Sequence, residues 1–317
     1  MLISVLIPCY NSEKSIRTVV ESTMSVFKND LPDYSCEFVL VNDCSADGTF
    51  EEIRSLANDY PCVHGISLMR NFGQHNGLMC AMNYASGDFL LGMDDDLQTQ
   101  ASEIPKIVHK IEEGYDLVYG VYESSQNSRA KNLTSRLNSF TSRILLGRPK
   151  NIRSSNFWCI TRAVRNEVIK SRNYNPYVDG LFYRTTHNIA NVTIEHHKRE
   201  FGSSNYTLGK LVRLWISYWN YSLLPLRLVS VIGVAMSIIG FISAFFIAMR
   251  KILNPSVPIG WSSIICVMLI FFGFVLLALG TIGEYIGEAV MTLNNAPQYI
   301  VRETVNVDET RTGSSAL

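Results

Sequence analysis

The sequence predicts an α/β protein, with a mostly parallel sheet within residues 1–207, followed by a hairpin of two transmembrane helices. Two observations lead to this expectation. In the first part of the chain, short apolar runs alternate with helix-like segments, which is typical of strand–helix–strand crossover units. Residues 226–290 are almost free of charge, and charged residues make up only 18% of the whole chain, against roughly 25% in soluble domains.

Five apolar runs are predicted strands, and polar turns separate them from the predicted helices. Asn11 or Ser12 can cap a first helix that reaches Phe27, and further helices are expected from Thr49 and near Asn76. The expected strands are 3–7, 37–41, 63–68, 89–93 and 117–121.

Two apolar stretches, 226–249 and 261–282, are long enough to cross a membrane. At ~1.5 Å rise per residue, the first extends ~36 Å as a helix, against a hydrocarbon layer of ~30 Å. It carries one charge, Arg227, and the second stretch carries none. The alternative is a buried helical hairpin in a soluble core, where two uncharged stretches of this length are rare.

The flanking segments complete the predicted organisation. Residues 208–225 combine aromatic and basic side chains, which suits an amphipathic helix lying in the headgroup region. Residues 291–317 are expected to form a cytosolic tail that is frayed from Arg302 onward.

The charge balance and the cysteine pattern argue against several classes of protein. Basic and acidic residues number 28 each, so no overall field attracts nucleic acid. The seven cysteines are dispersed without the short spacings of zinc sites, which favours reduced thiols and a cytosolic large domain. The chain opens on a strand-like run, Met1 to Ile7, rather than on a signal peptide.

Polar clusters follow several of the predicted strands. In open parallel sheets, ligands bind beyond the carboxyl ends of the strands, so these clusters are expected to form one site. They are 8–11, 42–43, 70–71 and 94–98.

The cluster at 94–98 predicts a metal site. Three consecutive carboxylates repel one another unless a cation lies among them. On an extended segment Asp94, Asp96 and Gln98 would share one side and offer the oxygen ligands that Mg²⁺ or Mn²⁺ prefers. A helix-capping acidic turn is the alternative. In the cluster near 42, Asp43 is the candidate for contact with a base or ribose, whereas Asp47 shapes the turn.

These segments resemble the family 2 glycosyltransferases of the GT-A (Rossmann-like) fold, through 5–11, 42–43 and 94–98. A closer resemblance is to the polyprenyl-phosphate branch, which contains dolichyl-phosphate mannose synthases, undecaprenyl-phosphate glucosyltransferases and the formamido-arabinose transferases. It covers roughly residues 3–301 and adds the segments 70–75, 115–120, 199–206 and 283–287.

The resemblance implies an enzyme that moves a sugar from a nucleotide diphosphate sugar, UDP-linked by analogy, to undecaprenyl phosphate with inversion. It implies a multi-pass protein of the cytoplasmic membrane, whose catalytic domain faces the cytosol. The resemblance implies that the nucleotide is bound by Pro8, Tyr10, Asn11, Asp43 and Asp94. It implies that the metal is bound by Asp94, Asp96 and Gln98, and the acceptor phosphate by Lys131, Ser135 and Arg199. The implied catalytic residues are Asp94, Asp96 and Arg199.

The sequence departs from the family pattern at several positions, among them Thr99-Gln100-Ala101, where prolines commonly follow the metal motif. The family usually has arginine near Tyr122 and at Lys131, and a small residue at Asp95. The changes at the two arginine positions weaken the predicted acceptor contacts, for which Arg129 or Arg136 could compensate. The donor contacts are unaffected.

Asp179 is a weaker candidate, as a general base, because a phosphate nucleophile is already ionised at neutral pH and needs no strong base. The segments 74–75 and 196–202 resemble the formamido-arabinose transferases, but glucose, mannose, galactose and N-acetylated sugars stay open.

Two other functions were weighed against sugar transfer to a lipid phosphate. A polysaccharide synthase would carry more spans and a Gln-x-x-Arg-Trp motif, which this sequence lacks. A non-catalytic membrane assembly subunit would not need Asp94, Asp96 and Gln98 intact. The two-span anchor could also pack against copies of itself as a homo-oligomer.

Overall fold

The computed structural model describes residues 1–96, 99–122, 148–195 and 260–307, with isolated helical residues between 229 and 249. The chain divides into two units, one of residues 1–208 and 295–317 and the other of residues 209–294.

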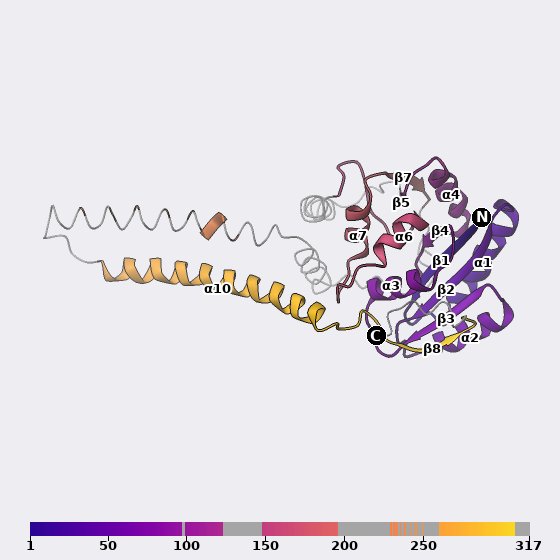
Figure 1. Ribbon diagram of the computed structural model, residues 1–317, viewed down its shortest axis with the longest axis horizontal. Helices are drawn as coiled ribbons and strands as arrows, with labels where there is room; N and C mark the ends of the chain where they lie inside the picture. Colours follow the sequence, from indigo (N-terminus) through magenta and orange to yellow (C-terminus); the bar gives the residue numbers. More distant parts are fainter. Residues whose placement is uncertain are drawn as a thin grey trace. The chain divides into compact units, whose positions relative to one another are not determined.

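The first unit is built on one sheet (Figure 1). Within the described residues the strand order is β7-β5-β6-β4-β1-β2-β3-β8. The strands are β1 (Leu2–Cys9), β2 (Ser35–Asn42), β3 (Val63–Leu68), β4 (Phe89–Gly92), β5 (Leu117–Tyr122), β6 (Trp158–Thr161), β7 (Ile189–Ile194) and β8 (Val301–Val305).

The centre of the sheet is parallel, as predicted. β1 pairs in parallel with β2 and with β4, and β2 pairs in parallel with β3. β5 and β7 are also parallel, whereas β6 runs antiparallel to both β4 and β5, and β8 runs antiparallel to β3. The carboxyl ends of β1, β2, β3 and β4 therefore meet at one edge, where ligands bind in such sheets.

Helices cover both faces of this sheet. α1 (Ile16–Asp30), α2 (Thr49–Asp59), the short η1 (Ala101–Glu103) and α4 (Ile104–Glu112) pack over one face, where their apolar sides meet alternate residues of the strands. The opposite face carries α3 (Gln74–Tyr84), α6 (Arg162–Val168) and α7 (Val178–Thr185), which contact one another and strands β1, β2, β4 and β6.

The expected start of the first helix was wrong, because α1 begins at Ile16. Ser12 does not cap it with its side chain. The Ser12 hydroxyl instead accepts a hydrogen bond from the Tyr10 amide at 3.1 Å and donates one to the Asp95 carboxylate. The segment between β1 and α1 is therefore held by the polar edge of the sheet.

The expectation that the chain frays from Arg302 onward was also wrong, since residues 301–305 form β8. The Met69 amide donates to the Ile300 carbonyl at 2.9 Å, and the Arg302 guanidinium donates to the Met69 carbonyl at 3.1 Å. The side-chain amide of Gln298 donates to the Ser171 and Asn173 carbonyls at 2.9 and 2.8 Å. The start of the predicted tail therefore belongs to the sheet unit, and residues 308–317 lie outside the described part.

The second unit contains α10 (Trp261–Leu293), a longer helix than the predicted span 261–282. Its residues 271–293 are apolar enough and long enough to cross a membrane, by length and composition. Of the other predicted span, 226–249, the described residues are helical, and the rest lie outside the described part. A two-helix hairpin therefore stays a prediction.

Candidate active site

The predicted polar clusters after β1, β2 and β4 lie together at the carboxyl edge of the sheet. The Asp43 amide donates to the Cys9 carbonyl at 2.9 Å, and the Met93 amide donates to the Leu6 carbonyl at 3.2 Å. These two bonds continue the parallel ladder past the strand ends. The chain that follows each strand therefore emerges beside its neighbours, as the sequence predicted.

Asp43 holds the loop that leads into α3. Only 4% of its surface is exposed, and its two carboxylate oxygens accept hydrogen bonds from the Phe72 and Gly73 amides at 2.7 and 2.8 Å. Burial raises the pKa of Asp43, and the two amide hydrogen bonds oppose that rise by stabilising the charged form. Asp43 thus fixes the backbone from which the helix begins, besides its predicted contact with a nucleoside.

Tyr10 and Asn11 shape the end of β1. Asn11 has a positive φ of 57°, which asparagine tolerates, and its side-chain oxygen accepts a hydrogen bond from the Ala46 amide at 3.1 Å. The Asn11 amide donates to the Ser45 hydroxyl at 3.0 Å, so the loops after β1 and β2 are tied together. The side chain of Tyr10 is 54% exposed beside them, and its ring offers a flat apolar surface to a ligand.

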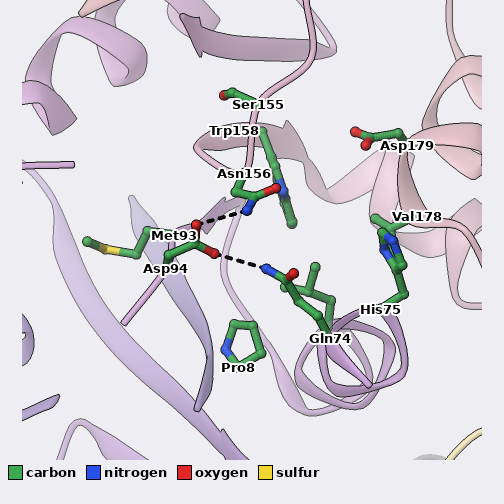
Figure 2. A pocket seen from close by; sticks show the side chains of 11 residues that line it. Pro8, Gln74, His75, Met93, Asp94, Ser155, Asn156, Trp158, Val178 and Asp179 are labelled. Atoms are coloured by element: carbon green, nitrogen blue, oxygen red, sulfur yellow. Dashed lines mark hydrogen bonds between the residues drawn. The ribbon is translucent and has the colours of Figure 1, made fainter. Parts of the chain in front are cut away.

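The three consecutive aspartates do not act as one cluster. Asp94 accepts hydrogen bonds from the side-chain amides of Gln74 and Asn156, each at 2.9 Å (Figure 2). Asp95 is turned toward β1, where it accepts hydrogen bonds from the Tyr10 amide at 3.2 Å and from the Ser12 hydroxyl. Burial raises the pKa of Asp95, and these donors partly offset the rise. Neutral protein donors therefore stabilise two of the three carboxylates, for which the sequence predicts a cation or a helix-capping turn.

The expected extended segment 94–98 is only partly as predicted. β4 ends at Gly92, and Asp95 and Asp96 lie in a bend. Gln98 lies outside the described residues. The residues of this bend fit a divalent cation, because Asp94 and Asp96 supply two carboxylates, which are hard oxygen ligands. Within the described part of the chain, no group of three or more histidine, cysteine or acidic side chains forms a closed metal site. One or two carboxylates completed by ligand phosphates is the arrangement that Mg²⁺ favours.

A pocket lies beside Asp94, between α3, the end of β4 and the start of α7 (Figure 2). Its apolar walls include Trp158, whose ring packs edge-on against Phe182 at 4.9 Å between centroids. A Cβ atom at Gly92 would lie 2.3 Å from the Trp158 ring, so a glycine is required there for this close approach. The residues that line the pocket are Pro8, Gln74, His75, Leu78, Met93, Asp94, Ser155, Asn156, Trp158, Val178 and Asp179.

Two titratable side chains line the pocket on the side away from Asp94 (Figure 2). Burial lowers the pKa of His75 to about 4, so the imidazole is neutral at pH 7. Asp179 accepts hydrogen bonds from the hydroxyls of Tyr119 at 2.6 Å and Tyr177 at 3.1 Å. Burial raises the pKa of Asp179, and the two phenol hydrogen bonds oppose that rise. The pocket therefore combines apolar walls with several convergent polar groups, as small-molecule sites do.

Sequence reasoning found part of this site. Pro8, Tyr10, Asn11, Asp43 and Asp94 lie together at the sheet edge. Asn156 and Trp158 were missed, because they reach the pocket through the antiparallel strand β6, which the sequence did not reveal. The predicted residues Gln98, Lys131, Ser135 and Arg199 lie outside the described residues.

Comparison with known proteins gives a consistent relationship. Residues 4–172 match the model of the family described as Glycosyl transferase family 2. The chain is 32% identical to the undecaprenyl-phosphate 4-deoxy-4-formamido-L-arabinose transferase of Yersinia pestis (strain Pestoides F), over 97% of this chain and 95% of that protein. The protein of the same name from Yersinia pseudotuberculosis serotype O:3 (strain YPIII) gives the same identity and coverage.

Among solved structures, the sheet unit is similar to glucosyl-3-phosphoglycerate synthase from Mycobacterium tuberculosis, crystallised with Mn²⁺ and UDP-glucose. The TM-score is 0.48, with 18% identity over 68% of this chain and 75% of that chain. The family match covers more than half of the chain, and the near full-length similarity to named transferases agrees with it. The chain therefore belongs to glycosyl transferase family 2 and is a glycosyltransferase.

Proposed function

We propose that this glycosyltransferase transfers 4-deoxy-4-formamido-L-arabinose from UDP to undecaprenyl phosphate. The observation that carries the proposal is the 32% identity to transferases of that name over 97% of the chain. The pocket beside Asp94 supports a small-molecule site there, because apolar side chains and several polar groups line it together.

The donor nucleotide binds at the ends of β1 and β2. The exposed ring of Tyr10 packs against the uracil, with Pro8 beside it, and the Asn11 backbone, held by the loop after β2, fixes the width of the nucleoside pocket. Asp43 keeps the loop 70–73 in place through the Phe72 and Gly73 amides and leaves lone pairs for a base or ribose.

Asp94, Asp96 and Gln98 would hold Mg²⁺ or Mn²⁺ beside the donor diphosphate. When bound, the ion neutralises charge that develops on the leaving diphosphate. The chain's own part is to fix Asp94, which the amides of Gln74 and Asn156 hold without neutralising it. Such prior orientation lowers the cost of reaching the reactive geometry.

The acceptor phosphate binds to Lys131, Ser135 and Arg199, and its oxygen attacks the anomeric carbon. The bond from that carbon to the diphosphate breaks as the new carbon–oxygen bond forms, so the configuration inverts. Arginine suits this role because its planar group donates two parallel hydrogen bonds to a phosphate, and lysine adds a point charge.

The membrane segments keep the enzyme beside its lipid acceptor. We place α10 and the stretch 226–249 across the cytoplasmic membrane, residues 208–225 in the headgroup layer, and the sheet unit in the cytosol, where nucleotide sugars are made. The length and composition of residues 271–293 support the first of these placements. Because the lipid acceptor is confined to the bilayer, an enzyme anchored there searches for it in the plane of the bilayer and not in three dimensions.

The test uses full-length protein in detergent with undecaprenyl phosphate, Mg²⁺ or Mn²⁺, and a panel of nucleotide sugars that includes the formamido-arabinose donor. Glycolipid should form from this donor only when lipid and metal are both present. Asp96→Asn should reduce the rate at least ~100-fold, since it replaces a charged metal ligand by a neutral amide and so weakens binding of the ion that offsets charge on the leaving diphosphate.

Asp59→Asn is the matched control, because it makes the same chemical change at an exposed ion pair with Arg17 and should leave the rate unchanged. Transfer only from a different donor would refute the proposed identity of the sugar. Release of nucleotide without any glycolipid would refute the proposed lipid phosphate acceptor.

A further inference from the structure

One polar atom in the pocket has no hydrogen-bond partner in the part of the chain that the structure describes. Nδ1 of His75 is shielded from solvent and accepts and donates nothing there. Folded proteins seldom leave a buried polar atom unpaired, and each such atom calls for an explanation, such as a catalytic role or a bound water or ion. His75 also lines the pocket that begins at Asp94.

The His75 ring is held in a fixed orientation. It packs edge-on against the Tyr177 ring, with 4.8 Å between centroids. The Tyr177 hydroxyl donates to Asp179 at 3.1 Å, and the other oxygen of Asp179 accepts from Tyr119 at 2.6 Å. The two oxygens of Asp179 therefore hold two phenols, that of Tyr119 and that of Tyr177, against which the His75 ring packs.

His75 and Asp94 lie on opposite sides of the pocket (Figure 2). Under the proposed function, the anomeric carbon of the sugar lies near Asp94, because that carbon carries the diphosphate. In a six-membered sugar ring, carbon 4 lies directly across from carbon 1. The substituent on carbon 4 therefore points to the His75 side of the pocket.

We propose that His75 is a specificity-determining residue, whose Nδ1 forms a hydrogen bond with the polar substituent on carbon 4 of the donor sugar. The inference rests on the proposed function, and it adds the residue that recognises the substituent on carbon 4 of the sugar. A formamido group carries both an N–H donor and a carbonyl acceptor, so either tautomer of the neutral imidazole finds a partner. A donor with hydrogen at carbon 4 leaves Nδ1 unpaired.

The experiment compares two donors in the full-length enzyme with undecaprenyl phosphate: UDP-4-deoxy-4-formamido-L-arabinose and its analogue with hydrogen at carbon 4. Wild type should prefer the formamido donor by at least ~10-fold in kcat/KM, the size of one neutral hydrogen bond. His75→Phe keeps a ring against Tyr177 and lacks the nitrogen. The kcat/KM of His75→Phe should be ~10-fold below that of wild type with the formamido donor and within about twofold of it with the analogue.

Two further variants separate recognition from folding. His75→Asn retains a hydrogen-bonding group and should recover part of the preference, whereas His109→Phe, the same change at an exposed histidine on α4, should keep the wild-type preference. An equal loss with both donors in His75→Phe, or no preference in wild type, would overturn the inference while leaving the proposed function intact. Failure of wild type to use the formamido donor would refute the proposed function, and this inference with it.

Discussion

At the scale of single residues, the site depends on carboxylates that are held by neutral donors. Backbone amides hold Asp43, side-chain amides hold Asp94, an amide and a hydroxyl hold Asp95, and two phenols hold Asp179. Neutral donors fix a carboxylate without cancelling its charge, because hydrogen bonds to the ionised form stabilise it. These hydrogen bonds therefore fix the orientation of the carboxylates, and they oppose the rise in pKa that burial gives Asp43, Asp95 and Asp179.

The buried His75 gives the protein a defined acid sensitivity. Its folded pKa of about 4 lies below the ordinary 6.5, so the unfolded state binds more protons between those two values. Stability should therefore fall as the pH is lowered through this window, by about 2 kcal/mol between pH 7 and pH 4.5. In wild type this loss corresponds to a decrease in Tm of about 5 °C.

The measurement is thermal unfolding of full-length protein in detergent, followed by tryptophan fluorescence at both pH values. His75→Phe should show a Tm shift about 5 °C smaller than that of wild type, because no imidazole is left to protonate. His109→Phe serves as the control. Identical pH dependence in His75→Phe and wild type would show that His75 is not buried in its neutral form.

At the scale of elements, the start of α3 sets one side of the pocket. Gly73 precedes the helix with φ 89° and ψ 158°, a conformation open essentially to glycine, and Asp43 holds its amide. The next two residues are Gln74, which holds Asp94, and His75, which lines the opposite side. The conformation at Gly73 thus places both side chains.

Gly73→Ala should destabilise the protein by about 1–3 kcal/mol, through backbone strain alone, because a Cβ there meets no atom within 4 Å. It should also raise KM for the donor several-fold, because α3 then begins differently. Gly114→Ala is the matched control, since Gly114 has φ 98°, has equally open surroundings and lies after α4. Steady-state kinetics and Tm for both variants test this, and an unchanged KM in Gly73→Ala would contradict the role given to the start of α3.

The elements that the sequence could predict are those with a local signal. β1 to β5 are apolar runs bounded by polar turns, and each was found within a few residues of its observed bounds. The sequence did not predict β6 or β8. β6 has only four residues, and β8 carries exposed polar side chains on a sheet edge, so neither forms a clear apolar run. The pairing between β8 and β3 joins residues that are far apart along the chain, so no local sequence pattern predicts it.

The same limit applies to the site. Asp43 and Asp94 follow predicted strands, and the topology of a parallel sheet then brings them together. The orientation of each carboxylate could not be predicted, because the donors to Asp94 come from α3 and from the segment before β6. The turn of Asp95 toward Ser12 likewise depends on packing across two strands.

At the scale of the whole molecule, the chain combines a sheet unit that carries the site with an apolar helix, α10, and then returns to the sheet as β8. The hydrogen bonds of Gln298 with Ser171 and of Ile300 with Met69 attach this returning segment to the sheet unit. The proposed reaction needs this combination, because one substrate is soluble and the other lies in a bilayer.

The most direct test of sugar transfer to a lipid phosphate is to identify both products by mass spectrometry. Full-length enzyme would be incubated with the formamido-arabinose donor and undecaprenyl phosphate. If only the sugar is transferred, the products are UDP and a glycolipid in equal amounts. The glycolipid then has a single phosphate, which links the sugar to the polyprenol. Release of UMP with a lipid diphosphate would contradict the account, because the bond broken would then lie between the two phosphates and not at the anomeric carbon.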